Sequence, residues 1–353
     1  MRRPAAPAHP AADTFSGAGV RLSVAILCAT LLLGGPPAAA QAPPPMPSAE
    51  RVRLAEALRL GDALRERLWP GWGSIATPVL LVTDHAEYLV AHPRPTPEFR
   101  SLGRDALLGR EVLARPRVFE PTLLAAFPAV NGVPTVVVGT PERTGKRSAE
   151  WVASVLHEQF HLWQYSLPDY YARVAALGLA GDDSTGRWML EFPFPYDSPP
   201  VGRAVERLAS ALARPAARDT PALSGVRAAR GALRSVLTPA EERYLEFQLW
   251  QEGTARFIEI MAVRAAAAAE PPDSAFRALP DYEPYRSTAD RLERRLRDQL
   301  QGLRLDRDRR TAFYPLGAAL ARLLDTLRPD WKRRYADGPP RLDHLLEGSS
   351  TGR

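Results

Sequence analysis

The residues most able to do chemistry form the pentapeptide His157-Glu158-Gln159-Phe160-His161. Residues four apart lie on one face of a helix, so both imidazoles can reach a single metal ion. Neutral imidazole is a good ligand for zinc, and we therefore expect His157 and His161 to bind Zn²⁺. Glu158 is then the expected general base, because it can take the proton of a metal-held water as that water attacks a carbonyl.

The sequence around this pentapeptide favours the helix that the spacing requires. An apolar stripe typical of a buried helix runs through it, namely Trp151, Val152, Val155, Leu156, Phe160 and Trp163. We expect the helix to begin at Ser148, which can cap it, and to run through about Tyr165 before Pro168 stops it. The alternative interpretation is a pair of core histidines with ordinary hydrogen-bond partners.

A catalytic zinc site needs a further ligand, since it normally has three from the protein and keeps one position for water. The position six residues after His161, where a third histidine could stand, holds Leu167. We therefore expect a carboxylate, and Glu252 is the first candidate. Glycine inside a helix costs about 1 kcal/mol relative to alanine, so Gly253 indicates close approach of another segment. We expect that segment to be the helix with the two histidines. Glu246 is the alternative third ligand.

Glu252 lies in a helix that the sequence predicts over 238–270. Its start combines Thr238 as the N-cap, Pro239 at the first helical position and Glu241 in the capping box. A Pro-Pro pair follows residue 270 and ends the helix. The carboxylate of Glu252 is therefore expected in the middle of this helix, well away from its capped start.

Three other residues are candidates for supporting roles. Glu259 follows Glu252 by seven residues and so shares its helix face, where it either orients a ligand histidine or forms an ordinary ion pair. A developing oxyanion needs a hydrogen-bond donor. Tyr314 is the first candidate for this donor and Tyr196 the second, while an ordinary half-buried tyrosine is the alternative for each.

These features resemble the gluzincin group of zinc metallopeptidases, the thermolysin-like enzymes with two histidines and one downstream glutamate as ligands. The resemblance covers two helices, 148–166 and 239–270, together with the strand Val133–Gly139 ahead of the first. It implies that His157 and His161 match the histidine ligands of that group, and it implies a zincin-like fold.

By the same resemblance, Glu158 matches the base and Glu252 the third ligand of Zn²⁺. The implied reaction is peptide-bond hydrolysis, and the implied substrate is a peptide or protein. The chain departs from the pattern of the group at two positions. Gln251 precedes Glu252 where asparagine is often found, and Arg256 stands where an acidic residue often follows.

The fold class expected from the whole chain is α+β, mostly α and zincin-like. A small strand-bearing N-terminal part over 48–145 should lead into a helical catalytic part over 146–353. Two short apolar, β-branched runs predict strands at 79–83 and 133–139. Hydrophobic spacing predicts further helices over 48–68, 201–213, 224–236, 288–303 and 316–327.

The N-terminus predicts a secretory signal over 1–40. Arg2 and Arg3 precede an apolar run over 24–33. Ala38-Ala39-Ala40 then supplies the small residues that are typical of a signal-peptide cleavage site. The run is too short to span a membrane, which takes about 20 residues, so we expect no stable membrane insertion after cleavage. The protein should then be exported, either periplasmic or secreted. A retained membrane anchor is the alternative.

Composition excludes several other kinds of site and partner. Cys28 is the only cysteine and lies inside the predicted signal, so the exported chain would have no disulfide and no thiolate ligand. A proline-rich linker is expected over 41–47. Arginines over 291–310 are interleaved with acidic residues, which is typical of a solvated helix face, and we therefore expect no nucleic-acid partner.

Two other classes of protein would share these features. One is a zinc-binding pseudopeptidase that binds peptides without cleaving them, and an intact Glu158 argues against it. The other is an exported helical binding module without a metal, in which the histidine pair is accidental. Substrate preference, cleavage at chain ends or within chains, and oligomeric state are open at this point.

Overall fold

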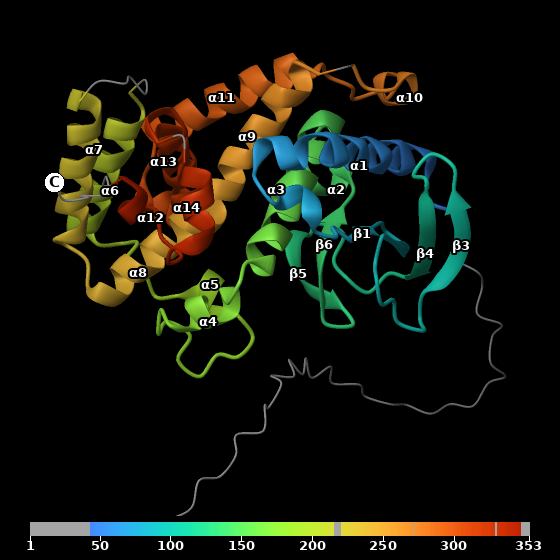
Figure 1. The fold of residues 1–353 in the computed structure, drawn as a ribbon, viewed down its shortest axis with the longest axis horizontal. Coiled ribbons are helices and arrows are strands. Elements are labelled where there is room, and N and C mark those ends of the chain that lie inside the picture. The colour runs from blue at the N-terminus through green and yellow to red at the C-terminus, as the bar shows by residue number, and fades with distance from the viewer. Residues whose placement is uncertain (1–42, 215–219, 270, 329, 347–353) are drawn as a thin grey trace, which may run out of the picture. The chain divides into compact units, whose positions relative to one another are not determined.

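The computed structural model describes residues 43–214, 220–269, 271–328 and 330–346, all within one compact unit (Figure 1). The fold is α+β, with a six-stranded sheet in the first part and helices through the rest. The predicted signal lies outside the described residues. The predicted linker is described from residue 43 onward and has no regular secondary structure. It is held in place by Tyr88, whose hydroxyl donates to the carbonyl of Pro45 at 3.1 Å.

The sheet is built from β1 (Val79–Val82), β2 (Ala86–Val90), β3 (Arg100–Asp105), β4 (Arg110–Pro116), β5 (Leu124–Val130) and β6 (Val133–Gly139). Their order across the sheet is β3-β4-β2-β1-β6-β5, so β5 is an edge strand. Only β1 and β6 run parallel among these strands. The β5–β6 hairpin turns at Asn131 and Gly132, whose φ angles of 47° and 69° are those that a tight two-residue turn requires.

The sequence predicted β1 and β6 but not the other four strands, and the pattern of apolar residues in each strand explains the difference. β1 and β6 are interior strands of the sheet, and each contains a run of consecutive apolar residues, 79–82 and 136–138. β2 is completely buried as well, but Glu87 interrupts its apolar run. β3 is almost wholly exposed, so it has no apolar alternation to recognise. β5 contains Pro128, which an edge strand tolerates but which argues against a strand in the sequence alone.

The longer helices agree closely with those expected from the sequence. They are α1 (Ser48–Leu68), α3 (Ser148–Ser166), α6 (Pro199–Leu212), α7 (Thr220–Arg234), α8 (Pro239–Gln248), α9 (Thr254–Ala267), α11 (Tyr285–Gln301) and α13 (Phe313–Leu327). Short helices connect them, namely α2 (Pro141–Thr144), α4 (Tyr170–Ala175), α5 (Trp188–Glu191), α10 (Ser274–Arg277), α12 (Leu305–Asp308), α14 (Trp331–Asp337) and α15 (Asp343–Leu346). The described residues also form two 3₁₀ turns, η1 (Trp72–Ser74) and η3 (Arg309–Ala312).

Helix α3 is the central helix of the molecule. It contacts β5 and β6 of the sheet as well as α1 and α9, and nearly all of its side chains are buried. The indole of Trp151 donates to the carbonyl of Gly139 at 2.7 Å, and the indole of Trp72 donates to the carbonyl of Gln159 at 3.1 Å. These hydrogen bonds and the surrounding core fix the position of the helix that contains both histidines.

The start of α3 is capped from a distant part of the chain. Ser148 does not cap the helix, contrary to the expectation, because it is already the first helical residue. Its backbone N–H instead donates at 2.7 Å to Asp281, which is 133 positions further along. The guanidinium of Arg53 donates to the same aspartate at 3.1 Å. The anionic cap satisfies a free N–H group at the positive end of the helix.

The helix predicted over 238–270 is present but contains an irregular turn. It begins with the expected capping box of Thr238 and Glu241. Between α8 and α9 the chain forms one π-helical turn, η2 (Leu249–Gly253), and the helix then continues to Ala267. Such π turns inside α-helices are frequent at functional sites. Glu252 lies within this turn.

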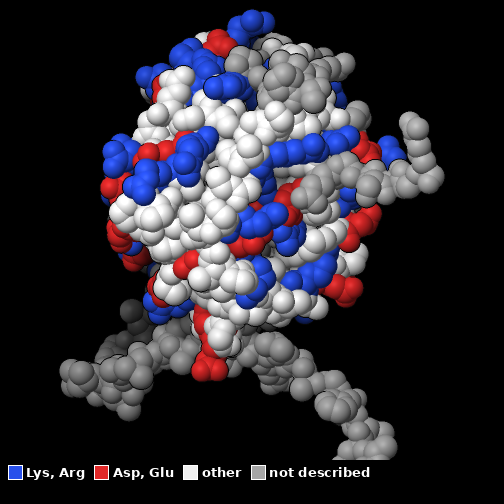
Figure 2. All heavy atoms as spheres, turned by 90° about the vertical axis from the view of Figure 1, so that its left-hand side faces the viewer, with Lys and Arg blue, Asp and Glu red and all other residues white. Residues whose placement is uncertain are grey.

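The surface of the helical part mixes charges of both signs. Figure 2 shows basic and acidic side chains lying side by side on the face at the left of Figure 1. Ion pairs in the helical part include Arg234 with Glu242 at 2.7 Å and Arg264 with Glu293 at 3.1 Å. In the part of the chain that the structure describes, no helix is both long enough and apolar enough to cross a membrane.

Candidate metal centre

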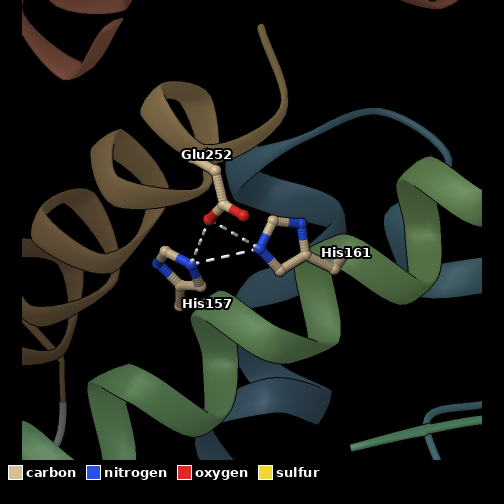
Figure 3. Close-up of side chains that lie close together, drawn as sticks. All are labelled: His157, His161 and Glu252. Carbon is tan, nitrogen blue, oxygen red and sulfur yellow. Dashed lines mark hydrogen bonds and ion pairs between the residues drawn. The ribbon is translucent and has the colours of Figure 1, made fainter. Parts of the chain in front are cut away.

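Three side chains from two separate helices converge in the interior (Figure 3). His157 and His161 project from successive turns of α3, and Glu252 projects toward them from η2. The two Nε2 atoms are 3.2 Å apart. Glu252 Oε2 lies 3.8 Å from Nε2 of His157 and 3.5 Å from Nε2 of His161. We refer to these three residues as the His–His–Glu cluster.

The separations within the cluster fit a zinc ion. Zinc bonds to nitrogen or oxygen of about 2.0–2.2 Å place neighbouring ligands of a tetrahedral site about 3.3–3.6 Å apart. The three distances of 3.2, 3.5 and 3.8 Å lie within a few tenths of an ångström of that range. Two imidazoles and one carboxylate are also a known donor set for catalytic zinc, which leaves the fourth position for water.

His161 is oriented by Gln164, which lies one turn further along α3. The Nδ1 atom of His161 is 2.6 Å from Oε1 of Gln164 and 3.2 Å from the amide nitrogen of Gln251. The shorter contact is to an acceptor, so a proton on Nδ1 would be donated to the amide oxygen of Gln164. That tautomer leaves Nε2 free to bind a metal. The amide nitrogen of Gln164 in turn donates to the carbonyl of Gln251 at 3.1 Å and to the hydroxyl of Tyr335 at 2.7 Å. Gln164 therefore connects α3 to the turn that contains Glu252.

His157 is flanked by carboxylates on both sides of its ring. Nδ1 lies 3.5 Å from Oε2 of Glu259, which also accepts from Arg256 at 2.6 Å. Burial lowers the pKa of His157, but Glu252 and Glu259 outweigh this effect and raise the pKa to about 10. The surroundings thus favour a positive charge at the cluster. A metal ion would take the place of the proton as that charge.

The second oxygen of Glu252 faces a different set of groups. Its Oε1 atom is 3.5 Å from Nη1 of Arg310, a residue of η3. Burial raises the pKa of Glu252, but the two histidines outweigh burial and hold the pKa well below its usual range. The carboxylate is therefore ionised over the whole physiological range, as a metal ligand must be.

Glu158 is buried beside the cluster without a partner. Only 7% of its surface is exposed, and no hydrogen bond or ion pair joins its carboxylate to another residue within the described ranges. Burial raises its pKa, and the nearby histidines lower it in part. A carboxylate that is buried, uncommitted and more basic than usual is well suited to accept a proton.

The two tyrosine candidates occupy different positions. The ring of Tyr314 stacks on that of His157, with 6.4 Å between centroids and 11° between planes. Its hydroxyl is 3.1 Å from Arg310 Nη1. Burial and the charge of Glu252 raise the pKa of Tyr314, so its hydroxyl keeps its proton and can donate. Tyr196 instead packs against Phe313, outside the cluster.

Two expectations from the sequence need correction. Glu246, the alternative third ligand, is buried in an ion pair with Arg230 of α7 and takes no part in the cluster. Gly253 is required by close packing, but the neighbouring segment is α13 and not α3. A Cβ atom at Gly253 would lie 2.3 Å from Cα of Gly317.

The structure also adds residues that the sequence analysis did not single out. Gln164 could have been found, because it follows His161 by three residues and so shares its helix face. Arg310 could not, because 58 positions separate it from Glu252 and no local pattern connects the two. A surface hollow of about 610 Å³ lies elsewhere, among residues of α11, α12 and α13 that include Arg294 and Gln299, and it contains none of the cluster.

Comparison of the chain with protein-family models, curated proteins and solved structures finds no match. The interpretation of the site therefore depends on its own chemistry. The donor set, the spacing of the donors and the uncommitted carboxylate beside them are each typical of a hydrolytic metal centre.

Proposed function

We propose that the protein is a zinc-dependent metallopeptidase that hydrolyses peptide bonds in peptides or proteins. One observation carries the proposal. Three metal-binding atoms of His157, His161 and Glu252 converge at distances close to a tetrahedral edge, and the next residue to His157 is a buried carboxylate without a partner. This combination supports a zinc site that holds and activates a water.

In this proposal each side chain near the cluster has a separate task. A zinc ion bound there would lower the pKa of a bound water and polarise the substrate carbonyl. Glu158 accepts the proton of the attacking water and then delivers it to the nitrogen of the leaving amine. Tyr314 donates a hydrogen bond to the oxyanion that develops on the carbonyl oxygen. Gln164 and Glu259 keep the two imidazoles in orientation.

The edge strand β5 supports a peptide as the substrate, and we infer a zincin-like arrangement of this strand and α3. No strand of the described sheet pairs with the outer side of β5. The hydroxyl of Tyr165 donates to the carbonyl of Ala126 in β5 at 3.0 Å, and its ring stacks on His161 with centroids 6.3 Å apart. An extended peptide added along this edge would therefore run beside the cluster.

Metal content and turnover test the proposal together. Purified protein is expected to hold about one zinc per chain, because one His–His–Glu cluster makes one catalytic site. The substitutions His157→Ala and His161→Ala should each release the metal and abolish cleavage of a mixed peptide library. Full zinc stoichiometry in both variants would refute the site. Zinc without turnover would indicate the pseudopeptidase, and protein without zinc the metal-free binding module.

We also propose that the protein acts after export. The order of basic residues, apolar run and Ala38-Ala39-Ala40 is that of a cleaved secretory signal. Sequencing of the mature N-terminus should find Gln41 or a residue within a few positions of it. Retention of Met1 on membrane-bound protein would favour the anchor instead.

A further inference from the structure

We propose that Arg310 binds a carboxylate of the substrate one residue beyond the scissile bond, so that the enzyme removes residues from the C-terminus of peptides. The inference rests on the proposed peptidase function of the site. It adds a substrate class, because the cluster and Glu158 by themselves do not distinguish a free C-terminus from an internal peptide bond.

The guanidinium of Arg310 is held by one of its three nitrogens. Nη1 lies 3.1 Å from the hydroxyl of Tyr314, 3.4 Å from Oε1 of Gln248 and 3.5 Å from Oε1 of Glu252. Nε and Nη2 have no hydrogen-bond or ion-pair partner among the residues of known placement, and 23% of the side chain is exposed. The edge formed by Nε and Nη2 is therefore not used by these contacts and is available to a ligand.

This free edge has the geometry that recognises a carboxylate. Two parallel N–H donors of a guanidinium match the two oxygens of a carboxylate, which gives a bidentate, charge-assisted pair. Partial burial strengthens such a pair because little water competes for the donors. The neighbouring Arg309 differs in its surroundings, since its side chain is exposed and its Nη1 pairs with Asp197 at 3.2 Å.

The distance between Arg310 and the His–His–Glu cluster limits where the carboxylate of the substrate can lie. The carboxyl group of Glu252 lies between Arg310 and the histidines of the cluster. Its Oε1 atom is 3.5 Å from Arg310 Nη1, and its Oε2 atom is 3.5 Å from His161 Nε2. One residue of extended chain spans about 3.5 Å. A substrate whose scissile carbonyl lies at the cluster can therefore place the carboxylate of the following residue at Arg310. A carboxylate several residues away would lie too far along the chain.

Three peptides test this inference by direct comparison. They are an N-acetylated tetra-alanine with a free C-terminus, the same peptide with a C-terminal amide, and the amide with aspartate as its last residue. The free acid should be cleaved with a higher kcat/KM than the plain amide, by roughly 10- to 100-fold, the factor expected for a charge-assisted pair. Arg310→Gln should reduce this ratio to about one, mainly through KM, while the matched variant Arg309→Gln should preserve it.

The ratio of kcat/KM for the free acid to that for the amide distinguishes recognition of the substrate carboxylate from an effect of Arg310 on the metal site. Arg310 also contacts Glu252, so its replacement can lower zinc occupancy, but lower occupancy reduces cleavage of acid and amide equally. A preference for the aspartyl amide over the free acid that disappears in Arg310→Gln would overturn removal of C-terminal residues, because Arg310 would then recognise an acidic side chain and not the C-terminus. Equal cleavage of all three peptides, or a preference for the acid that survives in Arg310→Gln, would overturn the inference.

A binding measurement gives a second readout that does not need turnover. In the Glu158→Gln background, titration calorimetry should find tighter binding of the free acid than of the amide, and Arg310→Gln should remove the difference. Zinc content is measured on the same samples. Absence of zinc would count against the proposed function itself, whereas zinc with equal binding of acid and amide would refute only the role of Arg310.

Discussion

Gly253 and Gly317 bring two helical segments into backbone contact. A Cβ atom on Gly317 would lie 2.6 Å from Cα of Gly253 and also 2.6 Å from the carbonyl oxygen of Leu249, distances that no real side chain tolerates. Glu252 directly precedes Gly253, and Tyr314 lies one helical turn before Gly317. The contact between the glycines therefore sets the separation of the proposed third ligand and the proposed oxyanion donor.

Gly317→Ala is expected to weaken both the fold and the metal site. Alanine gains about 1 kcal/mol of helix propensity over glycine, but the clash is with backbone atoms that cannot rotate away. Overpacking of this kind typically costs about 1–3 kcal/mol, so a net loss of stability and of zinc affinity should follow. Chemical denaturation and zinc competition measure the two effects.

Gly231→Ala provides the matched control for this substitution. Gly231 also lies within a helix, α7, but a Cβ atom there would meet nothing within 4 Å. Alanine at this position should be neutral or stabilise the protein by up to about 1 kcal/mol. Equal behaviour of the two variants would show that the contact between Gly253 and Gly317 is not needed.

Substitution of two glutamates, Glu252 and Glu158, should separate the effect on metal binding from the effect on catalysis. Glu252→Ala is expected to reduce zinc affinity strongly, because only two protein ligands remain. Glu158→Gln should keep the zinc, since the amide has the size of the carboxylate and the residue is not proposed to touch the metal. It should nevertheless lose nearly all hydrolysis, because an amide cannot accept the proton of the attacking water. Near-normal turnover in Glu158→Gln would disprove the mechanism even with zinc present.

Gln164→Leu should lower zinc affinity by about 10- to 100-fold, the usual effect of losing a group that orients a metal-bound histidine. The variant leaves Nδ1 of His161 without its acceptor at 2.6 Å. Gln159→Leu on the same helix is the control, because the amide of Gln159 faces Gly61 and has no hydrogen-bond partner among the described groups. A chelator competition assay should separate the two variants, and equal affinities would remove Gln164 from the site.

Asp281 should make the stability of α3 dependent on pH. Burial raises the pKa of Asp281, but hydrogen bonds from Ser148 and the charge of Arg53 outweigh it and hold the pKa below its ordinary value of 3.8. A lowered pKa means that the carboxylate stabilises the fold above about pH 4, and that this contribution is lost as the pH falls through the lowered value. Wild type and Asp281→Asn should therefore differ in unfolding free energy at pH 7 and converge in acid.

Glu142→Gln is the control for that comparison. Glu142 pairs with the same Arg53 at 2.9 Å, but 62% of its side chain is exposed. Exposed ion pairs contribute little to stability, so this variant should follow the wild-type curve at every pH. A constant difference between wild type and Asp281→Asn across the acid range would show that the charge of Asp281 is not the stabilising feature.

The sequence by itself determined the local features of this protein. The helix α3 and the spacing of His157 and His161 depend on residues within four positions of each other, so their pattern is visible in a short window. The capping box at Thr238 is local in the same way, and it correctly marked the start of α8. Strands β1 and β6 were found because each contains an uninterrupted apolar run, which the completely buried β2 lacks at Glu87.

Only the tertiary structure decided which of these elements and side chains contact one another. Glu246 and Glu252 lie on one helix, and no propensity distinguishes them, but Arg230 of α7 pairs with the first while α3 lies beside the second. The cap of α3 comes from Asp281, and the glycine contact of η2 comes from α13. These choices depend on which surfaces are buried together when the chain folds, and burial between separate segments of the chain leaves no periodic trace in the sequence.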